Sequence, residues 1–167
     1  MGYEIRRAVT DDAKYLANII VESWKATYIN IIPEDEIAKF LDKERRQKQF
    51  ERFIEDGEIV LIGIFDGMPC GLVFANKDND EQLAKCGSIN SMYFLKEYWG
   101  KGLGIKLMDE IINILKNEGC KQVSLWVYET NIRARNFYEK NGFIFDGTKK
   151  YSHFSNKPIE LRYVKQI

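Results

Sequence analysis

SINSMYFLKEYWGKGLG, residues 88–104, is the stretch that decides the fold of this chain. It reads as a strand that runs into a glycine-rich loop, Gly100 to Gly104, and then into an amphipathic helix. A loop of this kind at the start of a helix presents unpaired backbone N–H groups at the positive end of the helix dipole. Such a place suits phosphate oxygens. Glycines also make ordinary tight turns, so the interpretation depends on the segments that come after the loop.

Those segments are a helix, a strand and a second helix. Apolar residues recur at helical spacing at Ile105, Leu107, Met108, Ile111, Ile112 and Leu115, and Gly119 stands where a helix C-cap belongs. Gln122 to Tyr128 is a short β-rich run, and Asn131 to Phe143 reads as a helix stopped by Gly142. The spacing excludes two nucleotide loops. No Ser or Thr follows Gly100-Lys101 as in a Walker loop, and the third glycine of a dinucleotide fingerprint is missing.

These two motifs together resemble the Gcn5-related N-acetyltransferase (GNAT) superfamily. Residues 99–104 fill its acyl-CoA loop, [Q/R]-x-x-G-x-[G/A], except that Trp99 replaces Gln or Arg. The run N-x-x-A-x-x-F-Y-x-x-x-G-F, which begins at Asn131, looks like the family's second cofactor-contacting helix. The resemblance implies an α/β (α+β) fold, with a mixed, twisted, mostly antiparallel sheet flanked by helices. Two splayed parallel strands, near Ile89 to Leu95 and Val123 to Tyr128, would form the acyl-CoA cleft.

The elements before and after this unit agree with that order, and we expect a single domain over residues 1–167. The sequence predicts strands at Tyr3 to Val9, Ile59 to Phe65, Cys70 to Asn76, Phe143 to Lys150 and Ile159 to Val164. It predicts helices from Thr10, over Glu34 to Leu41, and within Asp42 to Glu55. Asp66-Gly67 is a strong signal for a two-residue hairpin turn, and Lys77 to Lys85 reads as a polar loop.

The resemblance implies that the chain transfers an acetyl group from acetyl-CoA to a primary amine, by direct attack in a ternary complex. The N–H of Met92 would meet the acetyl carbonyl, and Tyr93 and Phe94 would offer backbone bonds to the pantetheine arm. Tyr138 would be the general acid, because a phenol of pKa about 10 is protonated at neutral pH. The implied cofactor-binding residues are Met92, Tyr93, Phe94, Trp99, Gly100, Lys101, Gly102, Leu103, Gly104, Ile105, Asn131, Ala134, Phe137 and Tyr138.

Three assignments stay open at this point. The alternative function is a non-catalytic acyl-CoA-binding module of the same fold; the intact glycine loop and Tyr138 favour the enzyme. The general base is not identified: Ser88 stands where some family members have a carboxylate, and Glu22, His153 or a water chain are the remaining candidates. Because Trp99 carries no charge, we expect the loop N–H groups to hold the pyrophosphate, with Lys101 or Lys106 adding charge from outside.

The acceptor is expected opposite the cofactor, as a small-molecule or peptide amine. Trp24 and Tyr28 are four residues apart and share a helix face. Trp126 and Tyr151 could join them as substrate-binding residues, with Tyr93 and His153 nearby. No acidic cluster points at a polyamine, so the acceptor is not identified.

The composition of the chain limits the classes of partner that we expect and favours one cellular location. Lys plus Arg and Asp plus Glu are 25 each, and no basic stripe stands out, so we expect no nucleic-acid partner. No apolar signal segment or membrane-length run occurs, which favours a cytoplasmic protein without a membrane partner. Cys70, Cys86 and Cys120 are odd in number and far apart and accompany a single His. We therefore expect buried, reduced thiols and no metal site. A homodimer is left open.

Overall fold

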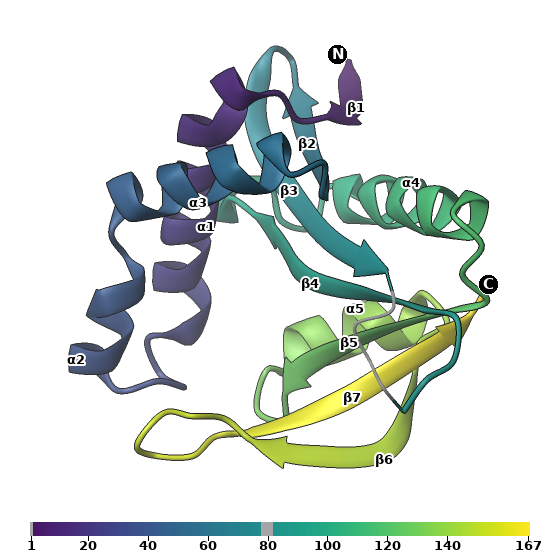
Figure 1. Ribbon diagram of the computed structural model, residues 1–167. Helices are drawn as coiled ribbons and strands as arrows, with labels where there is room; N and C mark the ends of the chain where they lie inside the picture. The colour runs from purple at the N-terminus through teal and green to yellow at the C-terminus, as the bar shows by residue number, and fades with distance from the viewer. Residues whose placement is uncertain (1, 78–81) are drawn as a thin grey trace.

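The computed structural model describes residues 2–77 and 82–167, which form a seven-stranded sheet with helices packed on both faces (Figure 1). The strand order is β1-β2-β3-β4-β5-β7-β6. The strands are β1 Tyr3–Arg7, β2 Ile59–Phe65, β3 Met68–Lys77, β4 Cys86–Phe94, β5 Gln122–Tyr128, β6 Ile144–Tyr151 and β7 Ile159–Gln166. The helices are α1 Ala13–Tyr28, α2 Glu34–Ile37, α3 Lys43–Glu55, α4 Leu103–Asn117 and α5 Ile132–Lys140, with 3₁₀ segments η1 Thr10–Asp12, η2 Ala38–Phe40 and η3 Lys96–Tyr98.

The expected fold class is confirmed. All neighbouring strands are antiparallel except β4 and β5, which run parallel and mark the middle of the sheet. Alternate residues of the strands enter two separate apolar cores. Val60 and Ile62 pack with α1 and α3, whereas Ile59 and Leu61 pack on the side of α4. The two helical layers therefore cover opposite faces of one sheet.

The β2–β3 hairpin forms at the predicted turn. Asp66 and Gly67 have φ angles of 48° and 80°, and the favoured two-residue hairpin turn needs positive φ at both positions. Strand β3 consequently begins at Met68, directly after the turn, rather than at Cys70. It also extends to Lys77, which the sequence assigned to the polar loop; residues 78–81 of that loop lie outside the described residues.

The start of the first helix depends on a buried carboxylate. Asp12 is 5% exposed and accepts hydrogen bonds from the two terminal guanidinium nitrogens of Arg6, at 2.6 and 3.0 Å. The same carboxylate accepts the Val9 N–H at 2.8 Å. The chain forms η1 at Thr10 and continues into α1 at Ala13. Asp12 thus ties β1 to the entry of α1, the helix that carries Trp24 and Tyr28.

Two other expectations can be compared with the described residues. Cys70, Cys86 and Cys120 are buried, and they form no disulfide with one another. Burial raises the pKa of the Cys70 thiol to about 11, so it is protonated at neutral pH. Within residues 2–77 and 82–167, no helix is long and apolar enough to cross a membrane.

Candidate functional site

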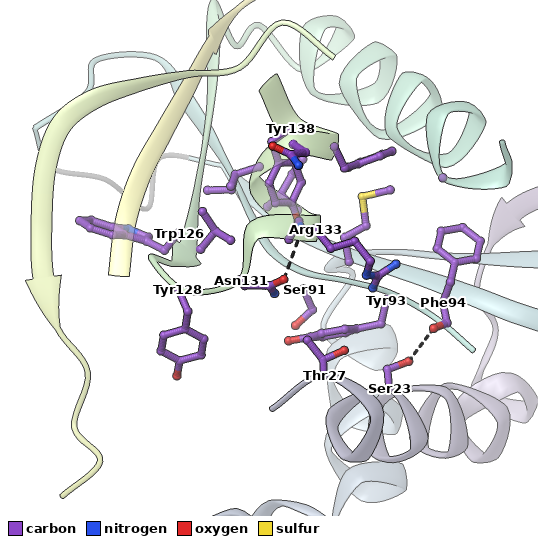
Figure 2. A pocket seen from close by; sticks show the side chains of 18 of the residues that line it. Ser23, Thr27, Ser91, Tyr93, Phe94, Trp126, Tyr128, Asn131, Arg133 and Tyr138 are labelled. Atoms are coloured by element: carbon purple, nitrogen blue, oxygen red, sulfur yellow. Dashed lines mark hydrogen bonds between the residues drawn. The ribbon is translucent and has the colours of Figure 1, made fainter. Parts of the chain in front are cut away.

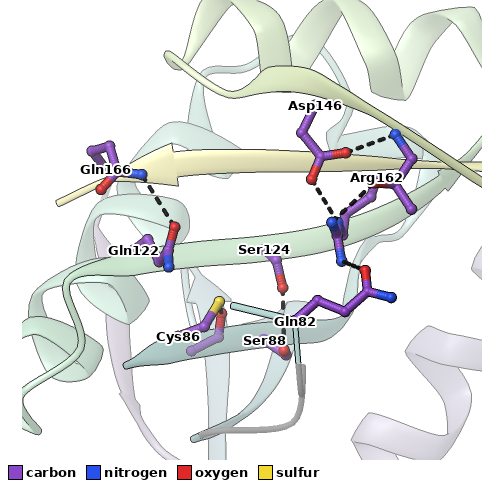
Figure 3. Close-up of polar contacts among 10 residues, drawn as sticks. Gln82, Cys86, Ser88, Gln122, Ser124, Asp146, Arg162 and Gln166 are labelled. Atoms are coloured by element: carbon purple, nitrogen blue, oxygen red, sulfur yellow. Dashed lines mark hydrogen bonds and ion pairs between the residues drawn. The ribbon is translucent and has the colours of Figure 1, made fainter. Parts of the chain in front are cut away.

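The cavity that carries the candidate site opens where β4 and β5 separate. The two strands pair only from Cys86 to Ile89 and from Gln122 to Leu125. Ser88 and Ser124 close this paired end, with their hydroxyls 3.2 Å apart (Figure 3). Beyond it lies a cavity of about 1080 Å³ lined by side chains from α1, β4, β5 and α5 (Figure 2). That volume is in the range of sites for large organic ligands.

A β-bulge in β4 coincides with the separation. Ala75 of β3 pairs with Ile89 and Phe74 pairs with Ser91, so Asn90 is an extra residue in the ladder. A bulge bends the strand and increases its twist. The part of β4 after Asn90 consequently has no β5 partner, and half of its backbone groups face the gap.

The direction of those groups follows from the β3–β4 ladder. Leu95 N–H donates to the Cys70 carbonyl of β3 at 3.0 Å, and backbone direction alternates along a strand. The N–H groups of Met92 and Phe94 therefore point away from β3, into the gap. Tyr93 pairs directly with Leu72, so its backbone faces β3 and it offers the cavity its side chain. The Phe94 carbonyl is occupied by Ser23 Oγ at 3.0 Å and Trp99 Nε1 at 2.8 Å.

The glycine loop leaves the N-terminus of α4 open. Gly102 is the N-cap residue in the left-handed region, at φ 75°, and no side chain caps the helix there. A Cβ added at Gly104 would lie 3.3 Å from the Phe137 ring, a tight contact, so a side chain here would push the ring away by a few tenths of an ångström. The lining includes Gly100, Gly102, Leu103, Gly104 and Ile105. Free N–H groups, a positive dipole end and the lack of covering side chains fit a pyrophosphate.

A cation reaches this loop from α5. The guanidinium carbon of Arg133 lies 3.4 Å from the centroid of the Trp99 ring, and both residues line the cavity. Desolvation lowers the pKa of Arg133, but an arginine remains charged at neutral pH. Lys101 and Lys106 lie over aromatic rings instead, 4.9 Å from the Tyr98 ring and 5.9 Å from the Tyr3 ring. Neither lysine is part of the lining.

Asn131 and Tyr138 occupy the α5 side of the gap. Asn131 caps the helix, since its side-chain oxygen accepts the Ala134 N–H at 3.2 Å (Figure 2). Tyr138 packs between Phe137 and Phe143, with ring centroids 5.5 and 5.8 Å away. Burial raises the pKa of Tyr138 above its ordinary value, Tyr93 adds to the rise, and Arg133 opposes it. The phenol is therefore protonated at any physiological pH. Ala134 and Phe137 also line the cavity.

Aromatic residues line the opposite side, next to α1. Trp24 and Tyr28 meet edge to face at 5.1 Å, and the hydroxyls of Tyr28 and Tyr93 are 3.1 Å apart. Tyr128 contacts Tyr28 with ring centroids 5.4 Å apart. Trp24, Tyr28 and Trp126, three of the predicted substrate-binding residues, all line the cavity.

Three of the sequence candidates lie elsewhere. Tyr151 is 72% exposed and outside the lining, because it follows Lys150 on β6 and neighbouring strand residues face opposite sides. His153 packs against Phe154 at 4.2 Å and is not in the lining. Glu22 pairs with Lys25 and Lys43 on the protein surface, at 3.1 and 3.0 Å. Neither His153 nor Glu22 is thus placed to act as a base in the cavity.

Sequence reasoning did not identify Glu160, which comes from the last strand. Its side chain is 18% exposed, lines the cavity and lies 3.4 Å from Lys150 Nζ. It pairs directly with Tyr128 across β5 and β7. Burial raises the pKa of Tyr128 to about 12, and the Glu160 charge adds to the rise. Among the described residues that line the cavity, Glu160 is the only carboxylate.

Comparison with known proteins gives consistent matches. The model of the acetyltransferase (GNAT) family matches residues 19–143. The chain is 28% identical over 165 residues to the spermidine N(1)-acetyltransferase of Thermoplasma acidophilum, covering 96% of this chain and 99% of that protein. It is 30% identical over 139 residues to an uncharacterized N-acetyltransferase of Archaeoglobus fulgidus, covering 81% and 88%. The crystal structure of PaiA N-acetyltransferase from Thermoplasma acidophilum in complex with coenzyme A has a TM-score of 0.79 at 25% identity, covering all of both chains.

Proposed function

Because this chain belongs to the acetyltransferase (GNAT) family, we propose that it transfers the acetyl group of acetyl-CoA to a primary amine of a small-molecule or peptide acceptor. The observation that carries the proposal is the gap after Ile89. It brings the Met92 N–H, the open α4 N-terminus and the Tyr138 hydroxyl to one cavity. The first would polarise the thioester carbonyl, the second would hold the cofactor and the third would protonate the departing thiolate.

The cofactor site fits acetyl-CoA by its donor set. The N–H groups at the start of α4 would hold the pyrophosphate, and Arg133 would add a cation held in place by the Trp99 ring. The Phe94 N–H, free of β3, would donate to the pantetheine arm. When bound, acetyl-CoA supplies the activated acetyl group.

Two residues would act on the reacting atoms. The Met92 N–H would donate to the acetyl carbonyl oxygen, where negative charge develops as the amine attacks; a backbone donor in a strand is already oriented for this role. Tyr138 would donate its proton to the departing sulfur, and the proton that the attacking nitrogen loses as it becomes the amide would pass to solvent, from which the phenol is restored. Its raised pKa keeps that proton available through the neutral range.

The acceptor would reach the gap from the side of α1. Trp24, Tyr28 and Trp126 supply an apolar wall on that side, and the amine attacks directly while acetyl-CoA is bound. The Thermoplasma acidophilum relative is named for acetylation of spermidine, which makes spermidine the first acceptor to test.

The test is transfer from acetyl-CoA to a panel of amines, followed by CoA release and by mass spectrometry of the product, beside a CoA-binding measurement. The panel contains spermidine, diamines, simple monoamines, aminosugars and short peptides. Saturable transfer to one amine class supports the proposal. Tight CoA binding without transfer to any amine would contradict it and favour the non-catalytic acyl-CoA-binding module.

A further inference from the structure

Glu160 is the feature of the cavity that the proposed reaction does not use. It stands on the acceptor side, because residues paired directly across two antiparallel strands share a sheet face and Tyr128, its partner, contacts Tyr28 of α1. Tyr138 approaches from α5, on the opposite face. A half-buried carboxylate in an aromatic cavity attracts a cation, since its charge is only partly screened by water.

The protein's own Lys150 occupies the space beside this carboxylate. Lys150 Nζ lies 3.4 Å from Glu160 Oε2 and 4.0 Å from the centroid of the Trp126 ring. A primary ammonium is thus held here by charge and by a cation–π contact at once. Lys150 belongs to the edge strand β6, and its side chain is 47% exposed. It can therefore turn outward into water when another ammonium takes its place.

We propose that Glu160 and Trp126 bind an ammonium group of the acceptor in the place that Lys150 fills in the free protein. This inference rests on the proposed acetyltransferase function. A carboxylate stabilises the protonated form of a bound amine, whereas the attacking nitrogen must be neutral. The nitrogen at Glu160 is therefore not the one that is acetylated. The acceptor class is a molecule with at least two basic nitrogens, one anchored and one reacting.

The experiment compares two acceptors of equal length, 1,4-diaminobutane and butylamine, with saturating acetyl-CoA. In the unaltered protein we expect kcat/KM to be at least about 10-fold higher for the diamine, since the anchoring charge pair is lost with the monoamine. Glu160→Gln should raise KM for the diamine roughly 10- to 100-fold, leave kcat and the CoA dissociation constant nearly unchanged, and remove the preference over butylamine. Lys150→Met should lower KM for the diamine, because it removes the internal competitor.

The matched control is Glu129→Gln. Glu129 also pairs with a lysine of β6, Lys149 at 2.9 Å, but it lies outside the cavity lining. This variant should keep the diamine preference. A Glu160→Gln protein that binds CoA normally and still prefers the diamine would overturn the inference.

Failure of the proposed function gives a different result. If no amine is acetylated, calorimetric binding of 1,4-diaminobutane to the CoA-saturated protein and to its Glu160→Gln variant decides the anchor alone. Weaker binding by the variant supports the anchor without the reaction. Equal binding, or none to either protein, overturns it.

Discussion

The guanidinium carbon of Arg133 lies 3.4 Å from the centroid of the Trp99 ring. Trp99 is fixed in turn by its Nε1–H, which donates to the Phe94 carbonyl at 2.8 Å. The ring therefore holds an α5 arginine beside a glycine loop whose first position carries no charge. The cation that lies over the Trp99 ring at the glycine loop thus comes from α5 and not from the loop itself.

We expect Arg133→Met to weaken CoA binding roughly 10-fold or more, because a charge-assisted bond to a phosphate is lost. Lys101→Met and Lys106→Met should have smaller effects, since those ammonium groups lie over the Tyr98 and Tyr3 rings. Trp99→Phe keeps a ring under the guanidinium and should fall between. Calorimetric CoA titrations of the four variants measure the order. A larger loss for either lysine than for Arg133 would refute this assignment.

Gly102→Asp should abolish measurable CoA binding. The substitution adds a negative charge at the N-cap of α4 and places a side chain where the pyrophosphate is expected. The control is Gly57→Asp, at a φ of 76° with equally open surroundings and outside the cavity. Both variants carry the left-handed backbone cost of about 1 to 2 kcal/mol, so both should unfold at a lower temperature than the unaltered protein. Only Gly102→Asp should lose CoA, and retained affinity in that folded variant would exclude the loop as the phosphate site.

Tyr138→Phe should lower turnover of the best amine roughly 10²-fold, within the range of general acid catalysis, with little change in the CoA dissociation constant. The ring contacts with Phe137 and Phe143 remain, so packing is preserved. Undiminished turnover would mean that another group or water donates the proton. A joint collapse of turnover and CoA binding would identify Tyr138 as a binding or packing residue.

The pH profile provides a check on the same residue. Because burial raises the pKa of Tyr138 above its ordinary value near 10, its proton stays in place as the pH rises through the range in which amines lose theirs. The rate constant kcat/KM should therefore climb with pH toward 9 without a falling limb. A fall below pH 9 that disappears in Tyr138→Phe would contradict the raised pKa.

Asp12→Asn should destabilise the fold by about 1.5 to 3 kcal/mol, the range for hydrogen bonds to a charged group. Asp12 is 5% exposed, and its hydrogen bonds with Arg6 hold the pKa of the carboxyl below its usual range. Its contribution is thus complete above the unfolded-state pKa of about 4 and is lost as pH falls through the lower folded-state value. Urea unfolding should show the full difference at pH 7 and a shrinking one below pH 4. Asp11→Asn, at an exposed neighbour, is the control and should change little.

Local sequence patterns predicted the helices, strands and turns. The cavity residues that they missed depend on how strands far apart in the sequence pair with one another. The Asp66-Gly67 turn and the apolar spacing of α4 depend only on residues that are close in the sequence, so both could be predicted. Glu160 could not, because it enters the cavity only through the β5–β7 register that sets it opposite Tyr128. Arg133 lay within the helix motif that begins at Asn131, and the absence of charge at Trp99 was a signal to look for a cation elsewhere. Tyr151 was predicted to bind the substrate, but its side chain is exposed; Lys150, the residue before it on β6, lines the cavity instead.

The bulge residue Asn90 shifts the alternation of side chains along β4 by one position. Ile89 points to the α4 side, yet Met92, three positions later, points there too, whereas an unbroken strand would send them to opposite faces. If Asn90 were instead paired with Phe74 as a regular ladder residue, Met92 would move opposite Leu72; its side chain would exchange sides with the Tyr93 ring, and its N–H would turn back into the β3 ladder. The position of the bulge between Ser88 and the glycine loop therefore decides which residues of β4 face the cavity. A β4 strand without this bulge, with Asn90 held in the ladder, would keep the fold but turn the Met92 N–H away from the cavity and the Tyr93 ring away from the aromatic wall.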